Sequence, residues 1–153
     1  MSRVDSKYEK KRVYKGSCLC GEVELEITGP IKSIIHCHCS KCRKNSGTAF
    51  ATNGFVSKKH FCILKGQDKL SRFETSPGKK RHFCRVCGSP VYSESDSTVE
   101  YVRLRLGILD SDIEQRPQSH NFVDSKANWE DLDANLPRYS EHEPSRELFT
   151  KKE

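Results

Sequence analysis

The grouping of eight cysteines constrains the fold of this 153-residue chain more than any other feature. They form two pairs, one triplet and a singleton: Cys18 and Cys20; Cys84 and Cys87; Cys37, Cys39 and Cys42; and Cys62. In a reducing compartment, cysteines two or three residues apart are more often metal ligands than disulfide partners. The spacing therefore predicts a fold that is held together by zinc.

The overall composition supports this expectation. Only 34% of the residues are hydrophobic and 31% are charged, so a chain long enough for one domain has a small core. A small core usually needs an additional source of stability, and bound metal is one.

The N-terminal sequence MSRVDSKYEKKR has charges but no apolar stretch after them. No later segment approaches the ~18 uninterrupted apolar residues of a membrane span, and the sequence contains no N-x-[ST] glycosylation motif. We therefore expect a soluble, cytoplasmic protein without a membrane partner.

The charge balance is basic, with 27 Lys and Arg against 21 Asp and Glu. Such a balance permits nucleic-acid binding, but acidic residues are interleaved almost throughout and no aromatic residues alternate with the basic runs. A solvated surface is the preferred interpretation, and a nucleic-acid partner is not expected.

Alternating hydrophobic residues predict strands. In residues 22–27, EVELEI places Val23, Leu25 and Ile27 on one face, which is typical of a half-buried antiparallel strand. Residues 99–109 alternate in the same way and would leave Arg103 and Arg105 on a wet face.

Other short strands are expected in the segments IKSIIHC, HFCIL, KLSRFET, KRHFC and SPVYS, while SKCRKNSG predicts one or two helical turns. The pattern indicates an all-β domain of small antiparallel sheets over residues 14–138, with polar tails at 1–13 and 139–153.

The two cysteine pairs together provide four thiolates for a closed, structural zinc site. Gly88, and by analogy Gly21, provides the permissive backbone of a tight turn after the second thiolate of its pair. Such a site would clamp the start of the domain onto a hairpin from its second half and contribute about 10 kcal/mol to folding.

The triplet Cys37, Cys39 and Cys42 is one ligand short of a closed site. In an extended segment Cys37 and Cys39 point the same way, so His36 and His38 point to the other side and are expected to be hydrogen-bonded rather than ligating.

Cys62, within an apolar strand, is expected to be a small buried residue. The fourth position of the second zinc would then be open, which is typical of a catalytic metal.

Three thiolates make zinc a weak Lewis acid that suits a soft sulfur ligand better than hydroxide. An incoming thiol would bind as a thiolate. Lys41, Arg43 and Lys44 would favour an anionic thiol, although simple solubility explains these charges equally well.

Several motifs then occur in a characteristic order: G-x-C-x-C-G at 16–21, C-H-C-x-x-C-R at 37–43 with Gly47, F-C-x-x-C-G-S at 83–89, G-x-L-D at 107–110, and HNFVDSKANW at 120–129. From about residue 14 to 138 the chain resembles the glutathione-dependent formaldehyde-activating enzyme family, which is also represented in centromere protein V.

The resemblance implies a β-tent-like all-β fold with a structural zinc on Cys18, Cys20, Cys84 and Cys87 and a catalytic zinc on Cys37, Cys39 and Cys42. It also implies carbon–sulfur lyase chemistry, in which glutathione and formaldehyde form S-hydroxymethylglutathione.

The segment HNFVDSKANW has two interpretations. We prefer the one in which Phe122, Val123 and Trp129 close the base of the core. In the other, His120, Asp124 or Lys126 lies near the open zinc position, as binding groups on loops often do. A general acid and base therefore stay unassigned.

Two other classes of function remain open. In the first, both zincs are structural and the domain is a binding module for protein or nucleic acid, with the fourth ligand from Cys62, a histidine or another chain. In the second, the protein is an enzyme with a zinc-bound water.

Overall fold

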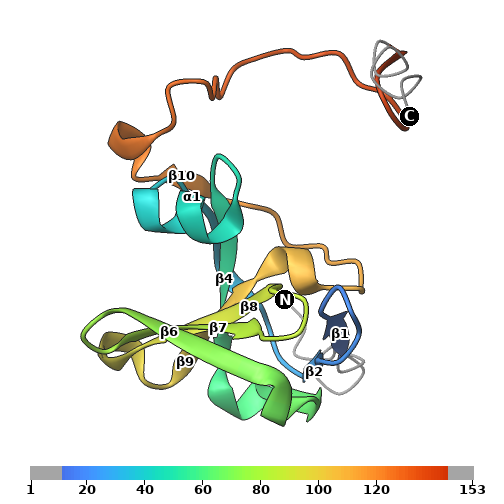
Figure 1. Ribbon diagram of the computed structural model, residues 1–153, viewed down its shortest axis with the longest axis vertical. Coiled ribbons are helices and arrows are strands. Elements are labelled where there is room, and N and C mark those ends of the chain that lie inside the picture. The colour runs from blue at the N-terminus through green and yellow to red at the C-terminus, as the bar shows by residue number, and fades with distance from the viewer. Residues whose placement is uncertain (1–11, 145–153) are drawn as a thin grey trace, which may run out of the picture.

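The computed structural model describes residues 12–144, which form short β-strands and one α-helix (Figure 1). The strands are β1 (Tyr14–Ser17), β2 (Glu24–Ile27), β3 (Lys32–Cys37), β4 (Ala51–Ser57), β5 (Phe61–Lys65), β6 (Leu70–Ser76), β7 (Lys79–Cys84), β8 (Pro90–Ser95), β9 (Tyr101–Arg105) and β10 (Ser119–Asn121). The α-helix is α1 (Ser40–Ser46), and single 3₁₀ turns are η2 (Lys58–His60), η3 (Gln67–Lys69), η4 (Asp96–Thr98), η5 (Leu106–Ile108) and η6 (Val123–Ser125).

The strands form two sheets, which confirms the all-β prediction. One has the order β1-β2-β5 and the other the order β10-β3-β4-β9-β8-β7-β6. All strand pairs are antiparallel except β10, which lies parallel to β3. This parallel pair was not expected, and it arises because a long connection returns the chain to the outer edge of β3.

The alternation in residues 22–27 is confirmed. Val23, Leu25 and Ile27 are fully buried and belong to the main core, which joins residues of both sheets. Cys18 and Cys84 belong to the same cluster, so the first cysteine group lies against the main core.

Strand β9 is shorter than the predicted 99–109, because the chain turns into η5 at Leu106. Val102 and Leu104 are buried as expected. The wet-face prediction was wrong for Arg105, which is only 8% exposed. Its side chain lies in the lining of two cavities rather than on an open face of the sheet, beside Cys37 and Cys42 in one of them.

The prediction for Cys62 was also wrong. In β5 the alternation turns Phe61 and Ile63 toward the core and Cys62 outward, so its thiol is exposed. An apolar neighbourhood in the sequence did not decide burial here, because β5 is an edge strand with one solvated face.

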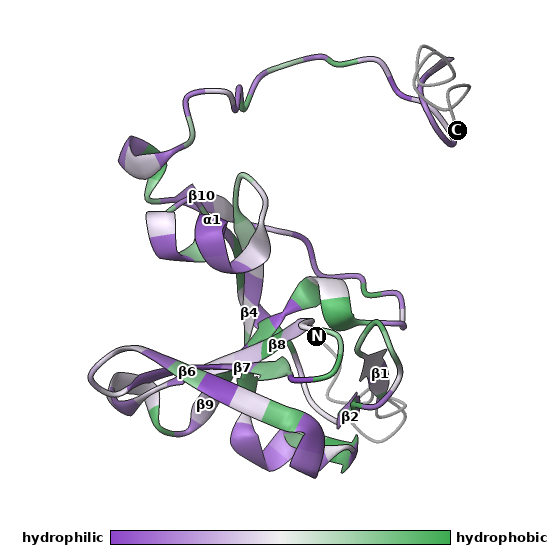
Figure 2. Ribbon diagram, in the orientation of Figure 1, coloured by the Kyte–Doolittle hydropathy of each residue, from purple (hydrophilic) through white to green (hydrophobic). Residues whose placement is uncertain are grey.

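The helix α1 is mainly hydrophilic (Figure 2) and buries a single residue, Cys42. Cys37, Cys42 and Ala51 form a small second cluster, separate from the main core. In Figure 1, α1 and β10 lie together at one end of the body. The second cysteine group therefore lies outside the packing that holds the two sheets together.

Most of the predicted tails, residues 1–13 and 139–153, lie outside the described residues, so the domain boundaries stay a prediction. Within residues 12–144, no helix combines the length and the apolar character that crossing a membrane requires.

Candidate metal centres

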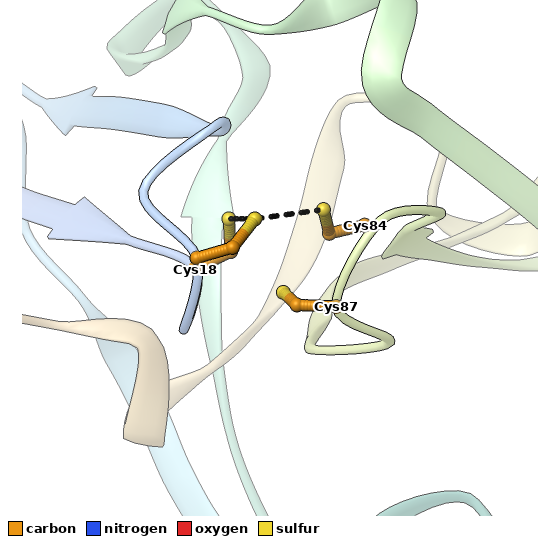
Figure 3. Close-up of side chains that lie close together, drawn as sticks. Cys18, Cys84 and Cys87 are labelled. Atoms are coloured by element: carbon orange, nitrogen blue, oxygen red, sulfur yellow. Dashed lines mark hydrogen bonds between the residues drawn. The ribbon is translucent and has the colours of Figure 1, made fainter.

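The first cysteine group is assembled by two turns that are distant in the sequence. Cys18 and Cys20 follow β1, Cys84 ends β7, and Cys87 lies in the turn to β8. In Figure 3, Cys18 faces Cys84 and Cys87 across the gap between these turns. All four Sγ atoms lie within 4.8 Å of one another.

The sulfur spacing fits a tetrahedral metal. The Sγ atom of Cys20 lies 3.6 Å from that of Cys18 and 3.8 Å from that of Cys84. Thiolates bound to one zinc at about 2.3 Å lie roughly 3.8 Å apart in a tetrahedron. The four cysteines therefore suit a metal ion without moving.

Glycines close both turns. Gly21 and Gly88 each have a φ of 80°, and their N–H groups donate to the carbonyls of Cys18 and Cys84 at 3.0 and 2.7 Å. Other residue types rarely adopt this conformation, which explains the glycine after each cysteine pair.

Cys87 is prepared as a thiolate. Hydrogen bonds from the Ser89 side chain and backbone lower the pKa of Cys87 to about 5. Cys20 in the same group differs: a backbone hydrogen bond at Glu22 lowers its pKa, but burial and the neighbouring thiols raise it to about 12 overall. A metal ligand must be deprotonated, so metal binding would release a proton from Cys20 but little from Cys87.

The second group combines a strand end with a helix start. Cys37 ends β3, Cys39 is the N-cap of α1, and Cys42 lies in its first turn. The Cys42 N–H donates to Cys39 Sγ at 3.4 Å, so the same sulfur caps the helix and faces the other two. The three Sγ atoms lie within 4.8 Å of one another.

Within residues 12–144, no fourth cysteine, histidine or carboxylate joins the triplet. His36 Nδ1 lies 2.8 Å from Thr52 Oγ1, and His38 Nε2 lies 2.9 Å from His120 Nδ1. The predicted hydrogen bonding of His36 and His38 is thereby confirmed.

The triplet opens onto a cavity of about 420 Å³. Five cationic residues line it, and its lining contains no aspartate or glutamate. The cations are Lys41, Lys79, Arg81, Arg103 and Arg105. Such a cavity favours an anionic ligand.

Sequence reasoning found only one of these cations. Of the predicted Lys41, Arg43 and Lys44, Lys41 alone lines the cavity. The others come from β7 and β9, which the strand order brings to the same face as Cys37. The available signal was the alternation in YVRLR, which places Arg103 and Arg105 on one face.

Two guanidinium groups share the cavity with the sulfurs, and one of them contacts a sulfur. Arg81 Nη2 lies 3.7 Å from Cys42 Sγ, and hydrogen bonds from Cys37 and Arg81 lower the pKa of Cys42 to about 4. Burial lowers the pKa of Arg105 to about 10, which leaves it cationic at neutral pH. The triplet therefore lies in a strongly positive environment.

A second, larger cavity of about 1070 Å³ lies beside Cys18, Phe50 and Trp129 and shares Arg105 with the first. None of the triplet cysteines lines it. We therefore place the candidate reaction site in the smaller cavity, where sulfur ligands and cations converge.

The segment HNFVDSKANW forms part of the site in a way the sequence did not indicate. Strand β10 pairs with β3 and places Asn121 opposite Cys37, and both Asn121 and Phe122 line the smaller cavity. Asp124 and Lys126 do not line it. His120 contacts His38 instead.

The preferred interpretation of this segment was wrong. Phe122 is 66% exposed, Val123 is 43% exposed and Trp129 is 67% exposed, so none closes the core. The segment follows an edge strand beside α1, away from the main core, where no layer of side chains covers it.

Phe122 has a left-handed backbone conformation with a φ of 60°. A bulky residue in this conformation costs about 1–2 kcal/mol, whereas asparagine adopts it readily. Because Phe122 is largely exposed, Phe122→Asn is expected to raise the free energy of unfolding by about 0.5–1 kcal/mol in denaturant titrations. Val123→Asn does not change a left-handed residue, so it should not raise the free energy of unfolding. Equal effects of the two changes would show that the backbone at Phe122 is not strained.

The comparison with known proteins agrees with this arrangement. The model of the family described as glutathione-dependent formaldehyde-activating enzyme matches residues 13–125. A protein of Halomonas elongata with a provisional description as such an enzyme is 27% identical over 128 residues, which cover 78% of this chain and 81% of the relative.

An Aspergillus flavus relative with the same provisional description is 29% identical over 115 residues, which cover 71% of this chain and 59% of the relative. The chain thus spans about three-fifths of this fungal relative. A crystal structure of a Rhodobacter sphaeroides protein shares the fold, with a TM-score of 0.57 and 23% identity over 69% of this chain and 98% of that chain. Since the family model covers most of the sequence, the chain belongs to the glutathione-dependent formaldehyde-activating enzyme family.

Proposed function

We propose that this protein is a zinc-dependent carbon–sulfur lyase acting on glutathione adducts, with formation of S-hydroxymethylglutathione as the model reaction. One zinc would be structural, on Cys18, Cys20, Cys84 and Cys87. The other would be catalytic, on Cys37, Cys39 and Cys42. The observation that carries the proposal is a triplet of cysteines without a fourth ligand from residues 12–144, at the wall of a cationic cavity.

The positive charge of the cavity suits the negative charge of glutathione. Glutathione has two carboxylates and one ammonium group, and its thiolate form adds a further negative charge. Lys41, Lys79 and Arg103 line the same cavity and provide cations for the carboxylates. These residues would bind and orient the tripeptide so that its sulfur reaches the three cysteines.

When bound, the metal would supply a means of keeping the thiol ionised at neutral pH. The chain itself would hold the thiol and carbonyl side by side and exclude bulk water from the reacting atoms. In the forward direction a carbon–sulfur bond forms and the carbonyl oxygen gains a proton, and no oxidant or reductant is needed.

A reducing compartment fits this chemistry. None of the eight cysteines forms a disulfide, and both the exposed Cys62 and a glutathione co-substrate stay reduced in the cytoplasm. We therefore propose the cytoplasm as the site of action.

Cobalt substitution tests the proposal. Protein loaded with cobalt(II) is expected to change its visible spectrum saturably with glutathione, because a new sulfur enters the coordination sphere of one metal. S-methylglutathione, which has no free thiol, should leave the spectrum unchanged. The same protein loaded with zinc should accelerate the exchange of formaldehyde with S-hydroxymethylglutathione, as measured by NMR. Absence of both the spectral change and the acceleration would refute the proposed function.

A further inference from the structure

Arg105 is a buried cation that forms no ion pair with a carboxylate in the described part of the chain, and its electrostatic partners of opposite charge are the thiolates of Cys42 and Cys37. It is 8% exposed, and its side chain donates only to the Arg103 carbonyl, at 3.4 Å. None of the ion pairs formed within residues 12–144 includes it. A buried charge costs free energy unless an opposite charge faces it. A metal on the triplet would offset most of the thiolate charge, so Arg105 would then favour an anion in the cavity that it lines.

The position of the Arg105 guanidinium group restricts which anion can bind to it. Arg105 pairs with Asn53 across β4 and β9 and shares the cavity with Cys37 and Cys42. Arg81 approaches from β7, with Nη2 at 3.7 Å from Cys42 Sγ. The two guanidinium groups thus accompany the triplet sulfurs themselves. An atom two bonds from a sulfur bound beside the triplet would lie in the cavity that both guanidinium groups line, whereas the carboxylates of glutathione are several bonds farther from its sulfur.

We propose that Arg105 and Arg81 form an oxyanion site, which holds the oxygen of the carbonyl substrate as it becomes an alkoxide. The inference rests on the proposed function and adds catalytic groups to it. The guanidinium group suits this role because it presents several N–H donors in a planar fork and stays charged. Donors placed where negative charge develops lower the barrier more than they improve substrate binding.

The thiolate sulfur gives an electron pair to the carbonyl carbon, and the carbon–sulfur bond forms. The π pair of the carbonyl moves to the oxygen, which becomes an alkoxide between the two guanidinium groups and then takes a proton from water. In the reverse direction the hydroxyl loses this proton, the carbonyl re-forms, and the carbon–sulfur pair returns to sulfur.

Thiosulfate is a probe of this site that needs no turnover. Its sulfonate oxygens lie two bonds from its donor sulfur, as the alkoxide oxygen does in the adduct, whereas 2-mercaptoethanol binds through sulfur without negative oxygens. Arg105→Gln should weaken thiosulfate binding to the cobalt-loaded protein about 10-fold or more, because a charged hydrogen bond is lost. Binding of 2-mercaptoethanol should change less than about 3-fold, since its sulfur meets the metal in the same way.

A matched control separates this effect from overall charge. Arg72 is exposed on β6 and does not line the cavity, so Arg72→Gln removes the same charge and should leave both affinities unchanged. In turnover, Arg105→Gln should lower kcat about 10²–10³-fold and leave the Kd of glutathione nearly unchanged. If glutathione binding falls while thiosulfate binding does not, the arginines bind a carboxylate and the oxyanion site is refuted.

Two further variants test the oxyanion site if Arg105→Gln does not fold. Arg81→Gln changes a half-buried residue and should weaken thiosulfate binding selectively, and Arg105→Lys should retain more thiosulfate affinity than any neutral replacement. Wild-type affinity for thiosulfate in Arg81→Gln would refute the oxyanion site and leave the proposed lyase intact. A wild-type protein whose cobalt spectrum responds to no thiol would refute both.

Discussion

Cys87→Ser is expected to unfold the domain. The four-cysteine group lies against the main core and connects the turn after β1 to the turn between β7 and β8. A structural zinc contributes about 10–16 kcal/mol of apparent binding free energy, which matches or exceeds the whole stability of a typical domain. Removal of one thiolate should therefore abolish the cooperative thermal transition measured by circular dichroism, even with zinc present.

Cys62→Ser is the matched control, because Cys62 is exposed and belongs to neither cysteine group. It should shift the free energy of unfolding by no more than about 0.5 kcal/mol. If Cys87→Ser melts like Cys62→Ser, the first group does not hold the fold through a metal.

Cys39→Ser is expected to remove activity while the fold stays intact. Cys39 caps α1 through its sulfur, and serine is a preferred N-cap residue, so the replacement keeps the helix start and removes only the thiolate. The second cluster is separate from the main core, so stability should change by less than about 1 kcal/mol. Changes beside a metal ligand already cost about 10–100-fold in activity or metal affinity, so loss of a direct ligand should exceed about 100-fold.

Metal analysis makes this prediction specific. Wild-type protein should contain two zincs, Cys39→Ser should retain one, and formaldehyde exchange should fall together with the lost metal. Equal loss of fold in Cys39→Ser and Cys87→Ser would contradict the division between a structural and a catalytic group. Full activity of Cys39→Ser with a single zinc would show that the triplet is not the reaction site.

Local sequence patterns predicted the parts of the fold that depend on local physics. The alternation around Leu25 identified a buried strand face because side chains alternate in any strand. The cysteine spacing separated a group of four from a group of three, because closely spaced thiols share a turn. Both predictions needed only residues close together in the sequence or a count of ligands.

The rest of the candidate site depends on which strands become neighbours. Arg81 and Arg105 reach the triplet because β7 and β9 belong to the same sheet as β3, which spacing along the chain does not encode. Phe122 lines the cavity because β10 pairs in parallel with β3 after a long connection. Cys62 was misplaced because the identity of edge strands is likewise a property of the assembled sheet.

The central claim is that one metal is enclosed by four sulfurs of this chain and the other by three, with its last position left for a thiol. X-ray absorption at the zinc edge, recorded with and without glutathione, measures the sulfur ligands directly. The account predicts seven sulfurs for two zincs in the free protein, the sum of the groups of four and three, and one more after glutathione is added. A sulfur count that glutathione leaves unchanged, with a side chain of the same chain bound as the last ligand in both states, would contradict it.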